Sequence, residues 1–341
     1  MTETATGKIK VLVVDDSLVF REFIAKGISS DPKIEVVAKS ADAFDARDKI
    51  IEFRPDVMTC DINMPKMDGI EFVRRLLPQY ALPVIVVSTV SEAVLDALDA
   101  GAVEFVVKPS HESNKSSEEF IKELIYKIKI ASVAKLKMKS TPSGEKIGAE
   151  MRPDERMVIA IGASTGGTEA IYSVLKELPA QMPGIVIVQH IPPIFSTLFA
   201  QRLDAQTAFE VKEAKSGDII KPGRVLLAPG SMQMSVRKEG GRYKVECYNG
   251  ERVNGHCPSV DVLFNSVAEQ VGKNAIGVIL TGMGSDGAKG LLQMRRAGAR
   301  TIGQDEKSSV VYGMPRMAYS IGAVERQADL QEIPELLMSM L

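Results

Sequence analysis

The sequence predicts two α/β domains in tandem, each built on a parallel sheet. Buried, β-branched runs alternate with amphipathic helical patterns along both halves of the chain. In the first half every strand is followed by a helix, which is the order of a doubly wound parallel sheet with helices on both faces. In the second half, short β segments with turn signals interrupt the alternation and predict an attached antiparallel hairpin. At 341 residues, the chain is long enough for about two domains of ordinary size.

Composition excludes several classes of protein. The chain is 45% hydrophobic and 25% charged with a formal net charge of −2, which indicates a globular protein and argues against a nucleic-acid partner, since that needs a basic face. Cys60, Cys247 and Cys257 have neither disulfide-framework nor zinc spacing, and they suggest a reducing compartment. No apolar run approaches the ~20 residues of a membrane span, and the N-terminus lacks a signal-peptide core. We therefore expect a cytoplasmic protein without membrane insertion.

The first half shows polar residues where its predicted strands end. We expect strands at 8–14, 34–40, 56–60, 83–88 and 104–108, and helices at 17–29, 43–53, 69–77, 92–100 and 117–138. Asp15 and Asp16 end the first strand, Asp61 the third and Lys108 the fifth. Converging carboxylates without His or Cys suit a hard cation such as Mg²⁺. Capping of the first helix by Asp15-Asp16-Ser17 is the alternative, but it explains one strand end only.

Four motifs of this half match a known family. VVDDS, CDINMPKMDG, VVST and FVVKPS occur in order and resemble the receiver domain of two-component response regulators over about residues 8–130. The resemblance implies a flavodoxin-like domain in which Asp61 accepts a phosphoryl group from a histidine kinase. It also implies that Mg²⁺ is bound by Asp16, Asp61 and the Asn63 carbonyl with support from Asp15, that Ser88 and Lys108 contact the phosphoryl oxygens, and that the Phe105 ring changes rotamer on activation. In phosphoryl transfer, metal and lysine neutralise charge that a bare carboxylate would repel.

A change of composition separates the two domains. Residues 131–156 lose apolar periodicity and gain Pro, Gly and charge, so we expect a linker, helical at its start, between domains at 8–130 and 157–341.

The second domain combines strands, a hairpin and helices. We expect strands at 158–161, 183–190, 275–282 and 301–304, and shorter β segments at 209–214 and 223–230. We expect a hairpin over 232–248 that turns at Glu239-Gly240-Gly241-Arg242. Helices are expected at 167–178, 196–203, 260–271, 284–297, 314–321 and 333–341.

The strongest local signal of the second domain is a serine in a glycine-rich turn. Gly162-Ala163-Ser164-Thr165-Gly166 follows an apolar strand, precedes a helical pattern and fits the G-x-S-x-G motif of hydrolytic serines. The motif alone is weak, because such turns also serve packing or phosphate binding.

A hydrolytic serine needs a base beside it and an acid that orients the base. His190 ends the strand after the one that presents Ser164, so adjacent strands would bring both to one edge of the sheet. His256 lies in a loop, where it can shape the cleft or contact substrate, and His111 lies in the first domain.

For the acid, Asp286 follows the strand 275–282, although it could simply cap the next helix. Asp261 and Asp305 are rivals; the register of the helix that Asp261 begins makes it less plausible. The chain order Ser, His, Asp matches neither the α/β-hydrolases nor the chymotrypsin or subtilisin orders.

Further motifs resemble a second family. IGASTGG, VIVQHIPP, PGRVLLAPG, HCPSVDVLF, ILTGMGSDGAKGL and QDEKSSVVYGMP look like the catalytic domain of bacterial chemotaxis protein-glutamate methylesterases, which also place a receiver ahead of it. The resemblance implies a Rossmann-like hydrolytic domain without a cofactor. It implies phosphorylation-activated hydrolysis of glutamate methyl esters on the cytoplasmic helices of chemoreceptors, with methanol release, and deamidation of receptor glutamines. By motif, Ser164 is the nucleophile, His190 the base and Asp286 its orienter, and the N–H groups of Met283 and Thr165 form the oxyanion hole.

The sequence differs from that family at two places, and two other functions have to be considered. Cys257 stands where many relatives carry arginine, and Ser231-Met232-Gln233 replaces a frequent Asp-x-His. Both lie outside the triad, so they concern rate and substrate contacts. A nucleotide-binding output would use the GASTGG turn as a phosphate cradle, but G-x-G-x-x-G is missing. A non-enzymatic scaffold would not need Ser164, His190 and Asp286 together.

Overall fold

The computed structural model describes residues 7–89, 93–109, 116–135 and 155–341. The chain divides into two compact units, residues 1–140 and 141–341. This division falls inside the segment 131–156 that the sequence assigns to a linker, and most of that segment lies outside the described residues. Within the described residues, no helix is both long and apolar enough to cross a membrane.

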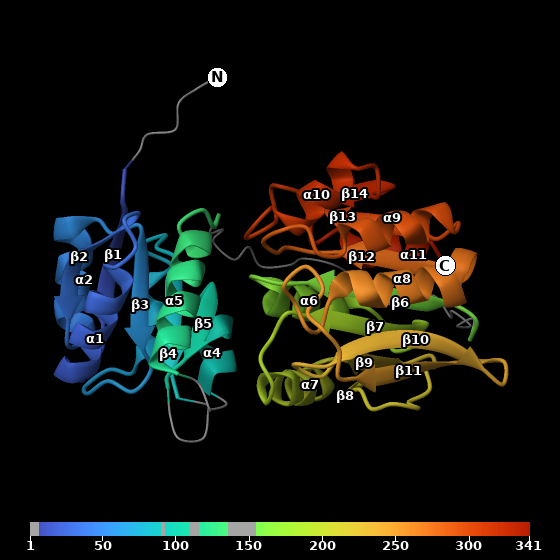
Figure 1. The fold of residues 1–341 in the computed structure, drawn as a ribbon, viewed down its shortest axis with the longest axis horizontal. Helices are drawn as coiled ribbons and strands as arrows, with labels where there is room; N and C mark the ends of the chain where they lie inside the picture. Colours follow the sequence, from blue (N-terminus) through green and yellow to red (C-terminus); the bar gives the residue numbers. More distant parts are fainter. Residues whose placement is uncertain (1–6, 90–92, 110–115, 136–154) are drawn as a thin grey trace. The chain divides into compact units, whose positions relative to one another are not determined.

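The first unit is built on a five-stranded parallel sheet in the order β2-β1-β3-β4-β5 (Figure 1). Its strands are β1 (Ile9–Val14), β2 (Ile34–Ser40), β3 (Val57–Asp61), β4 (Val84–Ser88) and β5 (Glu104–Val107). All residues of β3 and β4 are buried, which is why these strands are continuous apolar runs in the sequence. The chain adds β2 on one side of β1 and β3 on the other. Binding sites of such sheets lie at the carboxyl ends of the strands beside this reversal.

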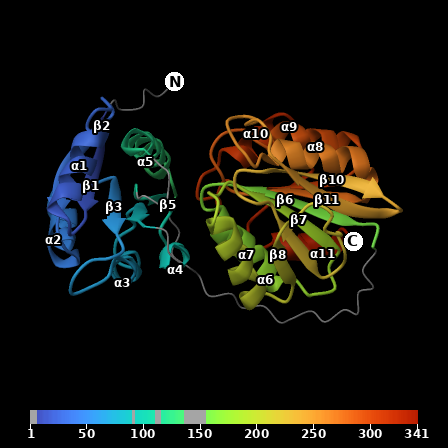
Figure 2. The ribbon, with the colours of Figure 1, turned by 60° about the horizontal axis from the view of Figure 1, so that its bottom comes forward.

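Helices cover both faces of this sheet. They are α1 (Leu18–Ile28), α2 (Ala43–Phe53), α3 (Gly69–Leu76), α4 (Ala93–Asp99) and α5 (Ser117–Ala131). α1 and α5 pack together on one face, where Ile24, Phe120 and Leu124 are fully buried, and α2, α3 and α4 form the other layer (Figure 2). Side chains at the helix starts, such as those of Ser17 and Asp42, accept hydrogen bonds from N–H groups of the first helical turn. These caps fix where the helices begin.

The second unit is built on a seven-stranded sheet in the order β14-β13-β12-β6-β7-β9-β8, and its strand pairs are parallel. Its strands are β6 (Val158–Ala163), β7 (Gly184–Gln189), β8 (Glu210–Glu213), β9 (Arg224–Leu227), β12 (Ala275–Ile279), β13 (Arg300–Gln304) and β14 (Arg326–Ala328). From central β6 the chain first adds β7 on one side and only later β12 on the other. The carboxyl ends of β6, β7 and β12 therefore meet where a doubly wound sheet carries its site.

Two layers of helices enclose the second sheet. They are α6 (Gly167–Glu177), α7 (Phe195–Gln206), α8 (Val260–Gln270), α9 (Ala288–Arg296), α10 (Met314–Ser320) and α11 (Ile333–Ser339), with one 3₁₀ turn at Gly272–Asn274. α6, α7 and α11 lie on one face of the sheet and α8, α9 and α10 on the other (Figure 2). α8 approaches β6 closely at Gly162, where a Cβ would lie 2.2 Å from Val260 Cγ1. This approach brings the start of α8 to the carboxyl edge of the sheet.

The predicted hairpin is present. β10 (Gln233–Glu239) and β11 (Arg242–Tyr248) pair antiparallel, with Glu239 opposite Arg242 across the turn. Gly240 and Gly241 both have positive φ, of 58° and 79°, which two-residue turns of this kind require. The buried side chains of the hairpin join the core that contains Leu263 and Phe264 of α8.

The structure differs from the sequence expectations at several boundaries. The helix predicted for 117–138 ends at Ala131, and residues 132–135 are not helical. Met138 lies outside the described residues. The helix predicted to open at Gly284 begins at Ala288, since Gly284 and Gly287 have φ of +90° and +85°, which a helix cannot contain. The strand predicted for 275–282 ends at Ile279, and three-residue β14 was too short to show a period.

Candidate functional site

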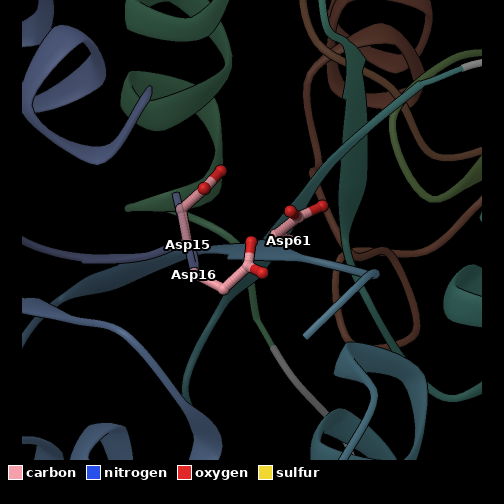
Figure 3. A group of neighbouring side chains, drawn as sticks. All are labelled: Asp15, Asp16 and Asp61. Carbon is pink, nitrogen blue, oxygen red and sulfur yellow. The ribbon is translucent and has the colours of Figure 1, made fainter. Parts of the chain in front are cut away.

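An acidic cluster lies at the carboxyl ends of β1 and β3 in the first unit. Asp15 follows β1 directly, Asp16 comes next, and Asp61 is the last residue of β3. Because β1 and β3 are neighbouring parallel strands, the three carboxylates come together, and each offers an oxygen within 4.8 Å of the others (Figure 3). Asp15 and Asp61 are buried, whereas Asp16 is exposed. Such an all-oxygen donor set suits a hard divalent cation.

Lys108 supplies the counter-charge inside this cluster. It follows β5, and its Nζ donates to Asp15 Oδ2 at 2.9 Å and to Asp61 Oδ2 at 2.7 Å. All three side chains of these ion pairs are largely buried. Burial raises the pKa of Asp61 above its ordinary value, and the hydrogen bond from Lys108 opposes that rise. The lysine can therefore neutralise charge on Asp61 or on a group attached to it.

The other residues predicted for the phosphoryl site lie on the same edge of the sheet. Ser88 ends β4, which lies between β3 and β5, and its Oγ is buried without a hydrogen-bond partner among the described residues. The Asn63 N–H lies 3.4 Å from Asp61 Oδ1. Phe105, within β5, is buried. The buried Ser88 hydroxyl can thus donate a hydrogen bond to an oxygen of a bound group, since no described protein group accepts one from it.

Ser164 stands in the turn between β6 and α6. Its N–H donates to the Thr281 carbonyl at 3.0 Å, and its carbonyl accepts from the Gly167 N–H at 2.7 Å and from Gln189 Nε2 at 2.9 Å. Gly166 has φ of +74°, and a Cβ on Gly167 would lie 2.1 Å from Gln189 Oε1. The shape of the turn therefore requires glycine at both Gly166 and Gly167, and it fixes the backbone of Ser164 at the carboxyl edge.

His190 lies beside this turn. It follows β7, and its N–H donates to the Ala163 carbonyl at 3.1 Å, so the parallel pairing of β6 and β7 places it next to Ser164 in space. Its Nε2 lies 2.8 Å from Asp286 Oδ2, and its Nδ1 is buried without a hydrogen-bond partner in the described part of the chain. With Asp286 ionised, Nε2 carries the proton, and this N–H donates a hydrogen bond to the carboxylate. The lone pair of Nδ1 is then free to accept a proton.

Asp286 is a buried carboxylate with several donors. Asn254 Nδ2 and Ser259 Oγ donate to its Oδ1 at 2.9 and 2.7 Å, and the Val260 N–H donates to its Oδ2 at 2.7 Å. Burial works to raise the pKa of Asp286, but the hydrogen bonds from His190 and Asn254 outweigh it and hold that pKa well below its ordinary range. The carboxylate is therefore ionised at neutral pH and fixed in orientation.

The two N–H groups expected to bind an oxyanion lie close to Ser164. Thr165 follows it in the chain. Met283 follows Gly282, whose Cα packs against the serine so tightly that a Cβ there would lie 2.7 Å from Ser164 Cβ. Neither the Thr165 nor the Met283 N–H donates a backbone hydrogen bond within the described residues. Both are free to bind a substrate oxygen.

The structure corrects the argument used against Asp261. The sequence suggested that its helix register turns it away from the core, but Asp261 is 4% exposed. It accepts from the Gly290 N–H at 2.6 Å and from Asn254 Nδ2 at 2.8 Å, while its own N–H lies 3.3 Å from Asp286 Oδ1. The N-terminal end of α8 is bound closely around both carboxylates, which the helical period alone did not indicate.

The remaining rivals occupy other positions. Asp305 accepts from the N–H and hydroxyl of Ser308, at 2.8 and 2.6 Å. The imidazole of His256 stacks on that of His190, with ring centroids 3.7 Å apart and an angle of 6° between the planes. His111 lies outside the described residues.

Sequence reasoning missed the polar residues that support the site. Gln189, Asn254 and Ser259 bind the residues described above, and buried Gln233 donates to the Glu251 carbonyl and accepts from the Ser259 N–H, each at 2.9 Å. The last residue of Ser231-Met232-Gln233 is therefore an anchor of the loop before α8. The sequence offered one signal for these residues: Gln189 is a polar amide at the end of an apolar strand.

The fold and this geometry define two classes of domain. The first unit has a buried aspartate among further carboxylates at the edge of a doubly wound sheet, which is the arrangement of a phosphoacceptor receiver. The second has a serine in a strand–turn–helix junction beside a buried His–Asp pair, which is the arrangement of a serine hydrolase.

Comparison with known proteins gives the family. Residues 159–337 match the family described as CheB methylesterase, and residues 11–116 match the response regulator receiver domain. The chain belongs to the CheB methylesterase family and carries a receiver domain ahead of the methylesterase domain.

Relatives agree over nearly the whole length. A protein-glutamate methylesterase/protein-glutamine glutaminase of Syntrophomonas wolfei is 57% identical over 334 residues, and one of Syntrophotalea carbinolica is 49% identical over 346; each alignment covers 98% of both chains. The crystal structure of the CheB methylesterase catalytic domain of Thermotoga maritima aligns with a TM-score of 0.53 at 35% identity, over 54% of this chain and 98% of that one.

The environment of His256 predicts a pH dependence of stability. Burial lowers the pKa of His256 to about 4, and a positive charge on His190 acts in the same direction. Between about pH 6.5 and 4 the unfolded chain therefore binds a proton that the folded chain does not, so stability falls as the pH falls through this window. His256→Phe removes this contribution.

We expect the urea midpoint of the wild type to fall more steeply than that of His256→Phe between these pH values. Because the chain has no tryptophan, circular dichroism is the suitable probe. The other titrating groups are common to both proteins. Parallel pH profiles of the two midpoints would show that His256 titrates normally in the fold.

Proposed function

We propose that this chain is a phosphorylation-activated protein-glutamate methylesterase and protein-glutamine glutaminase. Its substrates are methylated glutamates and certain glutamines of chemoreceptors, and its role is adaptation in chemotaxis. The observation that carries the proposal is the buried hydrogen bond between His190 and Asp286 beside the Ser164 turn, in a chain 57% identical to a relative named for both activities.

In the first half of the reaction, Ser164 Oγ attacks the carbonyl carbon of the ester. His190 Nδ1 takes the hydroxyl proton, while Asp286 keeps Nε2–H oriented and stabilises the imidazolium that forms. The N–H groups of Met283 and Thr165 donate to the oxygen that becomes negative. The imidazolium then gives its proton to the leaving oxygen. Methanol departs, and a glutamyl ester of Ser164 remains.

In the second half, His190 takes a proton from water, and the water oxygen attacks the acyl carbon. Collapse of the tetrahedral intermediate breaks the bond to Ser164 Oγ, which recovers its proton from the imidazolium. The product is the glutamate side chain. With glutamine as substrate the leaving group is ammonia, and the same residues carry both steps. No cofactor is needed in this unit.

The first unit is proposed to receive its phosphoryl group from a phosphohistidine of a histidine kinase. Asp61 supplies the attacking carboxylate oxygen, Lys108 neutralises charge on the transferred oxygens, and Ser88 Oγ donates to one of them. Phe105, on the strand next to Ser88, is proposed to change rotamer when the serine moves.

The acidic cluster fits Mg²⁺, since three carboxylate oxygens lie within 4.8 Å of one another and no His or Cys belongs to the group within the described part of the chain. Asp16 and Asp61 would hold the ion with the Asn63 carbonyl, and Asp15 would support that shell. When bound, the ion offsets charge between the carboxylates and the phosphoryl group. The proposed setting is the cytoplasm, where the kinase and the cytoplasmic helices of the receptors are the partners; a nucleic-acid partner and membrane insertion are not expected.

The proposed triad predicts graded kinetic losses. Ser164→Ala should abolish methanol release from methylated receptor without loss of fold. His190→Ala should be nearly as severe, with a loss of about 10⁴–10⁶ in kcat, because the members act as a unit. Asp286→Asn should cost about 10²–10⁴, since the carboxylate orients and stabilises the imidazolium without accepting the proton itself. Asp305→Asn is the matched control and should stay active. If His190→Ala lost little activity and His256→Ala were inactive, the general base would be His256.

The acidic cluster predicts metal-dependent phosphorylation. Asp61 should be labelled by a small phosphodonor such as acetyl phosphate only when Mg²⁺ is present, because without it the carboxylates repel the donor. Asp61→Asn should lose labelling, and Asp16→Ala should lose its dependence on the metal. Asp31→Asn, a residue paired with Lys129 away from the cluster, is the control. Efficient labelling in excess EDTA would contradict the proposed metal site.

Control by the receiver predicts different responses of two proteins. Methanol release by the full chain should rise with phosphodonor, and a tenfold rise needs only ~1.4 kcal/mol of coupling free energy. A fragment of residues 152–341 should be active and indifferent to the donor, because it lacks Asp61. If the fragment responds to the donor, or the full chain ignores it despite labelling of Asp61, the receiver does not control the esterase.

A further inference from the structure

A tight turn before α8 reaches both acidic and basic members of the triad. Val253 and His256 exchange two backbone hydrogen bonds of 2.9 Å, and the two residues between them, Asn254 and Gly255, have φ of +53° and +85°. Positive φ at both central positions defines a type I′ turn, for which Asn-Gly is the preferred pair. The sequence Asn254-Gly255 therefore fixes the conformation of this turn locally.

The side chains of this turn contact His190 and Asp286. Asn254 Nδ2 donates to Asp286 Oδ1 at 2.9 Å, and the His256 ring covers one face of the His190 ring at 3.7 Å, tilted by only 6°. Buried Gln233 holds the base of the loop through the Glu251 carbonyl. One locally determined turn thus restrains the acid by a hydrogen bond and the base by a stacked ring.

We infer that His256 is a positioning residue for His190, which keeps the imidazole plane aligned for proton transfer and takes no proton itself. The inference rests on the proposed function. The hydrogen bond at Nε2 alone restrains rotation about the Cβ–Cγ bond of His190 only weakly, because Nε2 lies close to that axis. Such rotation would turn the Nδ1 lone pair out of the orientation that it needs for the Ser164 hydroxyl. A parallel ring in van der Waals contact blocks this rotation. The orientation of the base matters for the rate, because misplacement by about 1 Å can cost about 10²-fold.

The charges around His256 favour its neutral form. The groups that act on it are His190 and Arg252, whose positive charges disfavour a further cation, and Asp286, whose negative charge favours one; burial adds to the first two and holds the pKa of His256 at about 4. When His190 becomes an imidazolium during the reaction, the stacked ring is therefore neutral. A neutral aromatic face beside a cation is attractive, so the stack does not oppose protonation of the base.

The test compares two substitutions of His256 in the full chain, using methanol release from methylated receptor. His256→Ala removes the ring and should lower kcat by about ten- to a hundredfold with KM within about twofold. His256→Phe keeps a flat ring that cannot titrate, and it should stay within about threefold of the wild type in kcat, with an unchanged kcat profile between pH 6 and 8. Val253→Ala, in the same turn but with an exposed side chain, is the matched control and should remain fully active.

Each other outcome overturns the inference. A phenylalanine variant as inactive as His190→Ala would mean that His256 itself transfers a proton. A raised KM with normal kcat in His256→Ala would make it a substrate contact. A fully active alanine variant would leave the stack without a role in catalysis.

A second measurement does not depend on the esterase activity. The chain has only three histidines, so ¹⁵N-histidine spectra resolve each ring. In the wild type, His190 should show narrow ring signals of one tautomer with the proton on Nε2. In His256→Ala the tautomer should stay, because Asp286 still binds Nε2–H, but the ring signals should broaden by exchange among ring orientations, while His256→Phe restores narrow signals. Identical His190 signals in all three proteins would overturn the inference. If even the wild type released no methanol, the proposed function would fail, but these spectra would still decide the role of His256.

Discussion

The site of the second unit depends on a charge buried in the protein. Asp286 is 1% exposed, and an ionised carboxylate in such surroundings is stable only when donors surround it. It obtains them from His190, from the Asn254 side chain, and from Ser259 and Val260 at the start of α8. Removing one donor would therefore disturb more than one bond, because the same carboxylate fixes the base, the turn before α8 and the start of that helix.

The topology of the sheet explains why these groups meet. Ser164, His190 and Asp286 follow β6, β7 and β12, which are neighbours in space although β12 comes more than a hundred residues after β6 in the chain. Each strand places one member of the proposed triad at the same edge. Glycine at Gly162, Gly167 and Gly282 then allows the helices and turns to approach so closely that no Cβ would fit. The close packing that brings the proposed catalytic residues together thus depends on these small residues.

The first unit also holds buried carboxylates at the carboxyl edge of a parallel sheet. Two buried aspartates at the ends of adjacent strands repel each other, and Lys108, arriving from the end of β5, pairs with both. An ion pair of this kind holds the cluster together and leaves Ser88 Oγ and the exposed Asp16 available. In both units, therefore, parallel strands bring the polar groups of a site to one edge, and residues distant in sequence stabilise a buried carboxylate.

The sequence by itself determined the strands, most helices, the hairpin turn and the residues at strand ends, because these follow from short-range patterns: apolar runs, capping side chains and the Gly-Gly turn. Asp61, Ser164 and His190 could be singled out for that reason. Only the tertiary structure decided which groups surround them. Asn254, Ser259 and Gln189 act through contacts with segments far away in the chain, Asp261 is buried against the expectation from its helix register, and the stacking of His256 on His190 joins a loop to a strand end. Such contacts depend on how whole elements pack against one another, and local periodicity carries no information about that packing.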